Sequence, residues 1–512
     1  MSRLKNSVYN TIWALVGNLS IALFGIVSRS IFVNTLGDEL MGVNSLFADV
    51  LTLFSFVDMG FGTAITFALY KPIAENNVVE IKAVLRFLQR IFNIMAIAIV
   101  LIGICFFPYL GSLKTEIPLK DLRVYYIIFM FNNVIGYLWT YRLTYVTAKQ
   151  EARRITAFDV AFSLGTTMLQ IAVVILVESF LLYLLMNSLL LVIKKVAINV
   201  YIAKRYPESN LHDAVQLGRE DRGRIWTKAK SLAVHKIANL SISQTDSLIV
   251  SYMISVKEWG LVSNYLMLKN TISGIASQVY SAILPSMGDL VARESKDKQL
   301  STFYVYDFLN FWVYAFCFVA LATLSSPFVS MVFGASRVID HFTVFVFFLS
   351  FFIAGLRDPV SILREANGAY ETDQIYTVIS AVVNLVASVI FVKTIGLPGV
   401  FLGTLCSTAV VLIARPIILF NQCYHISSKQ YFKTMAVYIL AAVAGYIMTE
   451  VCIALIAHAC GITILSFLLM MLTVALLPNI FWIAVFYRNR NFKELLHIMV
   501  NFVRVKKGKN EI

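Results

Sequence analysis

Five basic residues interrupt stretches of sequence that are otherwise apolar and long enough to cross a membrane. They are Arg29, Lys269, Arg357, Lys236 and Arg415. An ionisable side chain at the centre of a spanning helix costs at least about 2.5 to 3.5 kcal/mol on insertion, so such residues usually face a cavity or a partner. We therefore treat all five as candidate substrate-binding residues. The alternative is that each cation only forms an ion pair that locks two helices together.

Three acidic residues, Asp246, Asp49 and Asp58, also lie inside apolar stretches. Burial raises the pKa of a carboxyl group toward the working range, so each could bind a coupling ion, H+ or Na+. Asp58 has a structural alternative, because the glycines of the DMGFG sequence can loosen a helix and leave amides that a carboxylate satisfies. Asp246 or Asp49 could instead neutralise Arg29.

Two prolines follow charged residues within predicted spans. Pro359 follows Asp358, and Pro416 follows Arg415. Proline removes a backbone hydrogen bond, so each should kink its helix beside a charge and could serve as a hinge or as static curvature.

The six cysteines show no spacing typical of a metal or redox site. All lie in or beside apolar runs, which favours buried small hydrophobic residues. We find no motif for a bound cofactor and no catalytic constellation, so the sequence predicts neither a cofactor nor an enzyme.

The composition requires a lipid solvent for most of the chain. Of the 512 residues, 59% are hydrophobic and only 14% are charged, far from the roughly 25% charged residues of soluble domains. Apolar windows of about 20 residues recur along the chain and predict an all-α polytopic membrane protein with fourteen spans. The spans are 8–35, 41–69, 84–109, 122–147, 155–177, 179–203, 231–254, 258–284, 303–332, 338–365, 372–395, 399–423, 431–457 and 462–487.

The net charge of +14 is spread between these spans and is not gathered in one domain. That distribution argues against nucleic acid as a partner. Basic residues concentrate in alternate loops, as the positive-inside rule describes, and this places both termini in the cytoplasm. The predicted location is the cytoplasmic membrane of the cell, with membrane lipids as partners.

The longest polar stretch between spans follows the sixth helix and predicts a division into two lobes. We expect an N-terminal six-helix lobe at 1–205, a cytoplasmic linker at 206–230 and a C-terminal six-helix lobe at 231–425. Two further helices at 426–487 and a basic cytoplasmic tail at 488–512 complete the chain. A weak internal echo, GVNSLF from Gly42 and GLVSNY from Gly260, fits parallel six-helix repeats.

The segment from Arg29 to Asn77 resembles the opening of Wzx-like polysaccharide flippases of the multidrug/oligosaccharidyl-lipid/polysaccharide (MOP) exporter superfamily. The resemblance rests on Leu36 with Gly37, the NSLF run from Asn44, the DMGFG element and LYKP from Leu69 to Pro72. It implies two six-helix lobes around a central cavity and alternating access. The implied substrate is an undecaprenyl-diphosphate-linked oligosaccharide, moved to the outer leaflet for capsule, exopolysaccharide or O-antigen synthesis.

The same resemblance gives the buried cations a role, because guanidinium and ammonium groups can replace the water around a diphosphate. Arg29, predicted in the outer half of its helix, and Lys269, predicted near the membrane midplane, are the foremost candidates. A polysaccharide polymerase is a further partner that the resemblance implies.

Three other functions stay open at this stage. A lipid II flippase and a cation-coupled multidrug exporter belong to the same superfamily, although such exporters usually have twelve spans. A membrane glycosyltransferase or polymerase would need a catalytic carboxylate on the outer face, and the external loops are short.

Overall fold

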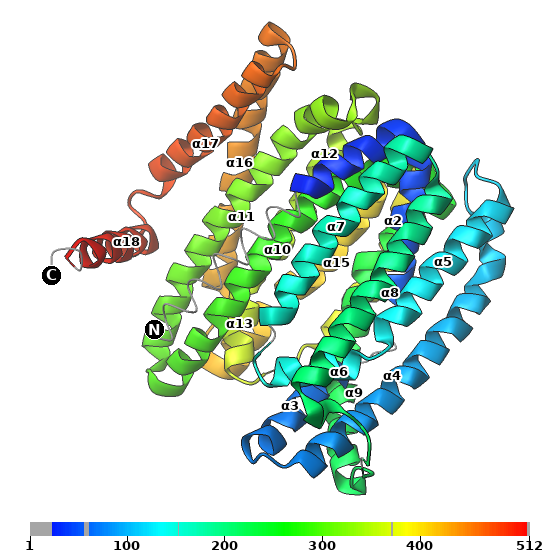
Figure 1. Cartoon of the computed structure of the whole chain (residues 1–512). Helices are drawn as coiled ribbons and strands as arrows, with labels where there is room; N and C mark the ends of the chain where they lie inside the picture. The colour runs from blue at the N-terminus through cyan, green and yellow to red at the C-terminus, as the bar shows by residue number, and fades with distance from the viewer. Residues whose placement is uncertain (1–22, 56–60, 152, 214, 370–371, 509–512) are drawn as a thin grey trace. The chain divides into compact units, whose positions relative to one another are not determined.

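The structure is a computed structural model that describes the chain except for residues 1–22, 56–60, 152, 214, 370–371 and 509–512 (Figure 1). Every regular element in the described part is a helix, which confirms the predicted all-α class. Nine described helices are long and apolar enough to cross a membrane, and shorter apolar helices cover Leu23–Leu36 and Ala64–Ala74. The chain is thus a multi-pass membrane protein, and the count of fourteen spans stays a prediction.

The described chain divides into two compact units, Met1–Gly260 and Leu261–Ile512. The predicted domain boundaries, with a linker at 206–230, stay predictions. In the first unit the helix over Leu23–Leu36 is followed by α2 (Asp38–Phe54), α3 (Phe61–Ala74), α4 (Val78–Phe106), α5 (Leu119–Tyr137), α6 (Thr140–Ala148), α7 (Arg153–Val177), α8 (Phe180–Arg205) and α9 (Arg219–Met253). Helix α10 (Val256–Arg293) begins in this unit and continues into the second.

The second unit continues with α11 (Lys296–Phe333), α12 (His341–Gly355), α13 (Asp358–Ala366), α14 (Gln374–Ile395), α15 (Leu397–Ile418), α16 (Lys429–Cys460), α17 (Ile464–Phe486) and α18 (Arg490–Gly508). Short helical turns η2 (Phe107–Ser112), η3 (Pro207–Ser209), η4 (Ala335–Arg337) and η5 (Leu419–Tyr424) lie between these helices.

Three predicted spans are each two helices in the structure. The span predicted at 41–69 comprises α2 and α3, and the one at 122–147 breaks between α5 and α6, where Trp139 has a left-handed φ of 59°. The span at 338–365 breaks into α12 and α13 beside Pro359, as its missing N–H predicts. Pro416 lies inside α15, which passes into the π-helical turn η5.

Side-chain caps fix where several helices begin. The Asn77 side chain accepts a hydrogen bond from the Glu80 backbone N–H at the start of α4, and Ser179 does the same for Leu182 at α8. Thr463 and Ser466 form a capping box at α17. These polar residues satisfy amides that the first helical turn leaves unbonded, so they mark the loop between consecutive spans.

Loops predicted on one side of the membrane meet at one end of the first unit. The Lys114 backbone N–H donates to Ser251 O at 3.2 Å, and the Val256 N–H donates to Lys114 O at 3.0 Å. Glu39 accepts hydrogen bonds from Thr115 and Glu116 at 2.6 Å. Three loops that the sequence places outside are therefore joined by hydrogen bonds at this outer end.

The two glycines of the internal echo pack reciprocally at the same end. A Cβ on Gly42 would lie well inside 3.0 Å of Val256 O, and a Cβ on Gly260 equally close to Asp38 O. Gly42 lies four residues after Asp38, and Gly260 lies four residues after Val256. Helices α2 and α10 begin at these two residues, Asp38 and Val256, so the echo corresponds to a symmetric backbone contact.

Aromatic side chains dominate the core of the second unit. The rings of Phe311 and Tyr438 stack with centroids 4.3 Å apart, and Trp482 donates to Ala441 O at 2.9 Å. Helix α18 turns away from the axis of α17 (Figure 1), and its Phe492 stacks on Trp312 of α11. Aromatic side chains thus hold α11, α16 and α17 together.

Small residues let α14 and α15 pack closely. Ser380 donates to Ser407 O at 2.7 Å and Ser388 donates to Val400 O at 3.0 Å. A Cβ on Gly403 would collide with Ser388. Small residues at such a helix pair are typical of membrane proteins, where backbones approach closely and hydroxyls bond across the interface.

Candidate functional site

Arg29 lies on the helix over Leu23–Leu36 in the first unit. Tyr183 of α8 and Asp38 at the start of α2 are close enough to act on its charge. Phe32, one helical turn further on, packs edge-on against Phe180 and Tyr183. The guanidinium is therefore placed near the outer end of the unit, beside aromatic rings that shield it from water.

The other candidates of the first unit lie on α2 and α9. Asp49 is half-buried on α2, and Asp246 is buried on α9. Lys236 also belongs to α9, but its side chain lies outside the described residues, as does the whole of Asp58. Their predicted roles stay predictions.

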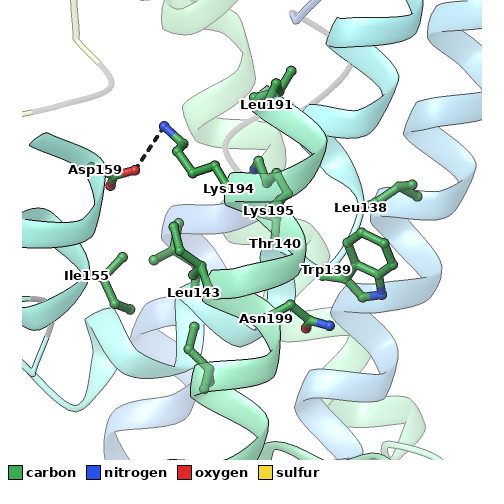
Figure 2. Close-up of a pocket in the computed structure, with 12 residues that line it drawn as sticks. Leu138, Trp139, Thr140, Leu143, Ile155, Asp159, Leu191, Lys194, Lys195 and Asn199 are labelled. Atoms are coloured by element: carbon green, nitrogen blue, oxygen red, sulfur yellow. Dashed lines mark ion pairs between the residues drawn. The ribbon is translucent and has the colours of Figure 1, made fainter. Parts of the chain in front are cut away.

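A hollow of about 110 Å³ lies where the α5–α6 break faces α7 and α8 (Figure 2). Lys194 of α8 reaches across it to Asp159 of α7, with Nζ 3.0 Å from Oδ1. The side chains are 24% and 47% exposed, so this ion pair is only partly buried. Two residues on neighbouring helices thus present opposite charges at the rim of a cavity.

Lys195, which follows Lys194 on α8, forms a hydrogen bond to the backbone beside the break between α5 and α6. Its ammonium donates to Gly136 O at 2.9 Å, a carbonyl in the last turn of α5 that the interrupted helix leaves available. Thr140 Oγ1 donates to the same oxygen at 2.8 Å. Lys195 and the indole of Trp139 therefore form part of the wall of the hollow.

A second hollow of about 250 Å³ continues along α7 and α8 and shares Leu191 and Lys194 with the first. Five of its eight lining residues are polar or charged, which is a high share for a pair of helices in a membrane. The polar members are Ser163, Thr166, Thr167, Asn187 and Lys194.

The opposite, predicted cytoplasmic rim of the first unit holds a separate ion pair. Lys149 Nζ lies 2.6 Å from Glu208 Oε1, to which Tyr145 also donates at 2.8 Å. Partial burial opposes the ionisation of Glu208, but hydrogen bonds from Lys149, the backbone and Tyr145 outweigh it and lower the pKa of its carboxyl. Arg142 donates to Asn199 and Asn210 nearby.

In the second unit Lys269 of α10 lies over the ring of Phe347 on α12, with Nζ 4.9 Å from the ring centroid. Phe347 itself packs edge-on against Phe348 and Phe401. A cation over an aromatic face is stabilised by the ring quadrupole.

Arg357 lies at the break between α12 and α13. Its Nε donates to Ala354 O at 3.0 Å, and Asp358, which accepts from Tyr314 at 2.6 Å, is its neighbour. Arg357 and Arg415 are near enough to repel one another electrostatically. The structure therefore brings two of the five predicted cations into one cluster.

Asp373, before α14, is the centre of that cluster. It forms ion pairs with Arg364 of α13 and with Arg415 Nε at 2.7 Å, and Arg415 also donates to Ser361 at 2.8 Å. The side chains of Arg364 and Asp373 are 3% and 0% exposed. Arg415 thus has the internal acid partner that the helix-locking alternative requires.

Sequence reasoning missed several of these groups. Asp373, Lys194 and Arg364 were not among the candidate site residues predicted from the sequence. Asp307 of α11 is also buried, at 4% exposure, although an acid inside an apolar run is a visible signal. Among the described residues no group of three or more His, Cys, Asp or Glu could hold a metal ion.

Comparisons with known proteins agree with this architecture. The lipid II flippase MurJ in an inward closed conformation superposes with a TM-score of 0.65 at 14% identity, covering 93% of this chain and 99% of the other. An inward-facing multidrug resistance MATE family transporter of the MOP superfamily gives 0.60 at 17% identity, covering 78% and 96%. The MATE multidrug transporter DinF-BH gives 0.56 at 11% identity, covering 81% and 95%.

These likenesses establish the fold of the MOP superfamily. No curated protein sequence matches the chain. The sequence profile described as "Polysaccharide biosynthesis protein" matches residues 7–291, more than half of the chain. The chain therefore belongs to the polysaccharide biosynthesis protein family.

Proposed function

We propose that the protein is a flippase that moves an undecaprenyl-diphosphate-linked oligosaccharide across the cytoplasmic membrane by alternating access. The observation that carries the proposal is that Arg29 lies inside the apolar helix over Leu23–Leu36 and Lys269 of α10 lies over an aromatic ring, in a chain from the polysaccharide biosynthesis family. A diphosphate needs cations to replace its water, and a cation within a span needs a compensating anion. The substrate is that anion for at least part of the cycle.

The two cations differ in how they would hold the substrate. Arg29 offers a planar guanidinium that can grip two phosphate oxygens, whereas Lys269 offers a point charge held over Phe347. Arg357 belongs to the same proposal: its Nε is bonded to Ala354 O, and the charges of Arg415 and Asp358 are close enough to act on its guanidinium. For Arg415 the pair with Asp373 makes a helix-locking role the better supported one.

Transport by this scheme needs an energy source, and a buried acid could supply it by binding H+ or Na+. Asp246 and Asp49 are the proposed coupling groups of the first unit, and Asp307 joins them from the second because it is buried within α11. A polysaccharide polymerase would take up the flipped product outside.

A lipid II flippase is the second candidate. The likeness to MurJ covers nearly the whole chain, and lipid II is also a polyprenyl-diphosphate-linked saccharide. The two substrates share the diphosphate and differ in the sugar, so the cations discussed above serve either one.

The test is reconstitution of the purified protein into vesicles with a defined lipid-linked oligosaccharide and a readout that is specific for one leaflet. Arg29→Ala and Lys269→Ala should each abolish flipping while the protein still inserts and folds. Arg29→Lys should rescue partly, because it keeps the charge and loses the bidentate geometry. Lys71→Ala is the matched control, since Lys71 is 79% exposed at a helix end.

One outcome would overturn the phosphate role of Arg29. If the guanidinium only neutralised Asp246, the double variant Arg29→Ala with Asp246→Ala would recover flipping at equal protein level, because neither charge would remain buried alone.

A further inference from the structure

We propose that the hollows between α7 and α8 bind the anionic, hydroxyl-rich headgroup of a diphosphate-linked lipid, with Lys194 exchanging Asp159 for a phosphate oxygen. The proposal rests on the function proposed above and assigns part of the substrate path to the first unit. It concerns residues that are not among the five predicted cations.

The shape of the site supports a ligand larger than an ion. The two hollows, of about 110 and 250 Å³, share Leu191 and Lys194, which Figure 2 labels among the residues that line the smaller one. Together they extend along α7 and α8 from the α5–α6 break. An ammonium at the junction can therefore bind the charged part of a ligand while the rest extends into the larger hollow.

The lining of the larger hollow suits sugar hydroxyls. Thr166 and Thr167 donate to the helix carbonyls of Phe162 and Ser163, so their oxygen lone pairs are left to accept hydrogen bonds. Asn187 adds an amide with two donors and an acceptor. Groups that accept and donate in this way match a ligand rich in hydroxyls.

The charge of the smaller hollow suits a diphosphate. Lys194 and Lys195 contribute two positive charges against the single negative charge of Asp159. The Lys194–Asp159 pair is partly exposed, and such pairs contribute little to stability, so a more highly charged anion can displace the carboxylate. Lys195 stays bonded to Gly136 O and supplies positive charge without moving.

The competing explanation is that the ion pair only fastens α7 to α8. The two explanations differ in the sign of one effect. If Asp159 competes with the ligand for Lys194, removing the carboxylate should strengthen binding, whereas a structural clamp would weaken binding when either partner is lost.

The experiment measures the affinity of the purified full-length protein in detergent for farnesyl diphosphate by calorimetry. Lys194→Gln should weaken binding about tenfold, the loss expected for one charge-assisted hydrogen bond. Asp159→Asn should tighten it several-fold, and Lys194→Arg should keep it. The matched control is a second ion pair between different elements of this unit: Lys149→Gln and Glu208→Gln should leave affinity unchanged, because neither residue lines either of these two hollows.

Thermal midpoints of all variants show whether each is folded. Equal affinity for inorganic pyrophosphate and farnesyl diphosphate would assign the site to the diphosphate group, and tighter binding of the farnesyl ester would assign it to the lipid headgroup; both uphold the proposal. Equally tight binding of farnesol, which has no phosphate, would overturn it, as would weaker binding in both Lys194→Gln and Asp159→Asn.

The binding measurement involves no transport, so the two proposals fail separately. If Lys194→Gln weakens binding and Asp159→Asn strengthens it, but the protein flips no lipid in vesicles, the binding site stands and the flippase proposal fails. If the protein flips lipid but both variants lose affinity equally, the flippase proposal stands and the binding site fails.

Discussion

The two units use the same kind of ion pair in opposite ways. In the first, Lys194 and Asp159 meet at the rim of a hollow with side chains that are 24% and 47% exposed. In the second, Asp373 is fully buried between two arginines, of which Arg364 is 3% exposed and Arg415 15%. An exposed pair can exchange partners at little cost, whereas a buried pair cannot lose one member without leaving a charge uncompensated.

The difference indicates that the role of a charged residue inside a membrane protein depends on how deeply it is buried and on which partners it has. The cluster around Asp373 joins α13, the start of α14 and the last turns of α15 by buried ion pairs. In the first unit, polar and charged side chains line two hollows, where a ligand can contact them. We therefore expect the Lys194–Asp159 pair to affect binding more than stability, and the cluster around Asp373 to affect stability more than binding.

The largest expected effect comes from Asp373→Asn. The change leaves two buried guanidinium groups without their acid and should lower the free energy of unfolding by roughly 3 to 5 kcal/mol. Thermal unfolding of the purified protein in detergent measures it. Asp159→Asn is the matched control and should change stability by less than about 1 kcal/mol, because its pair is exposed. Equal losses in the two variants would remove the distinction between the two units.

A smaller loss should follow from Gly260→Ala in the first unit. The added methyl group would collide with Asp38 O, so α2 and the start of α10 must separate, at a cost of about 1 to 3 kcal/mol. Gly42→Ala should behave in the same way, because its contact with Val256 O is the reciprocal one.

Gly165→Ala in α7 is the control for these glycine variants. No described atom lies within 4 Å of the position of its added Cβ, so the helix should gain up to about 1 kcal/mol from the better helix former. A gain in Gly260→Ala as well would show that the outer end of the first unit is not closely packed.

The smallest effect concerns pH and the rim of the first unit. The pKa of Glu208 lies below its ordinary 4.5 in the folded protein, because the hydrogen bonds from Lys149, its backbone and Tyr145 outweigh desolvation. A depressed carboxyl pKa stabilises the fold above the unfolded value, and this contribution is lost as pH falls through the folded value. The thermal midpoint of Glu208→Gln should therefore lie slightly below that of the original protein at pH 7. The gap should close below about pH 4.5; a gap that widens in acid would contradict the assignment.

The sequence predicted the fold class well because spans are long, uniform signals. Apolar windows located the helices, and Pro359 located the break between α12 and α13. The break at Trp139 had no comparable signal, since neither glycine nor proline lies at that position. Only the structure shows the left-handed backbone of Trp139 and the hydrogen bond from Lys195 to Gly136 O beside it.

The candidate site was predicted less completely, because the sequence gives the depth of a charge but not its partner. Arg415 was expected to bind substrate, and its neighbour Asp373 lies 42 residues away in sequence. Lys194 was not among the predicted cations, and its pairing with Asp159 on the neighbouring helix was not predicted either. Pairing of this kind is fixed by tertiary packing and has no local signal.

The reciprocal contact of Gly42 and Gly260 also sets an order of assembly. The ribosome completes α2 long before the start of α10, and at roughly 5 to 20 residues per second the interval is about ten to forty seconds. Throughout it, the bare backbone around Gly42 has no partner from residues 256–260. Until those residues emerge, the outer end of the first unit lacks this backbone contact and cannot reach its final packing.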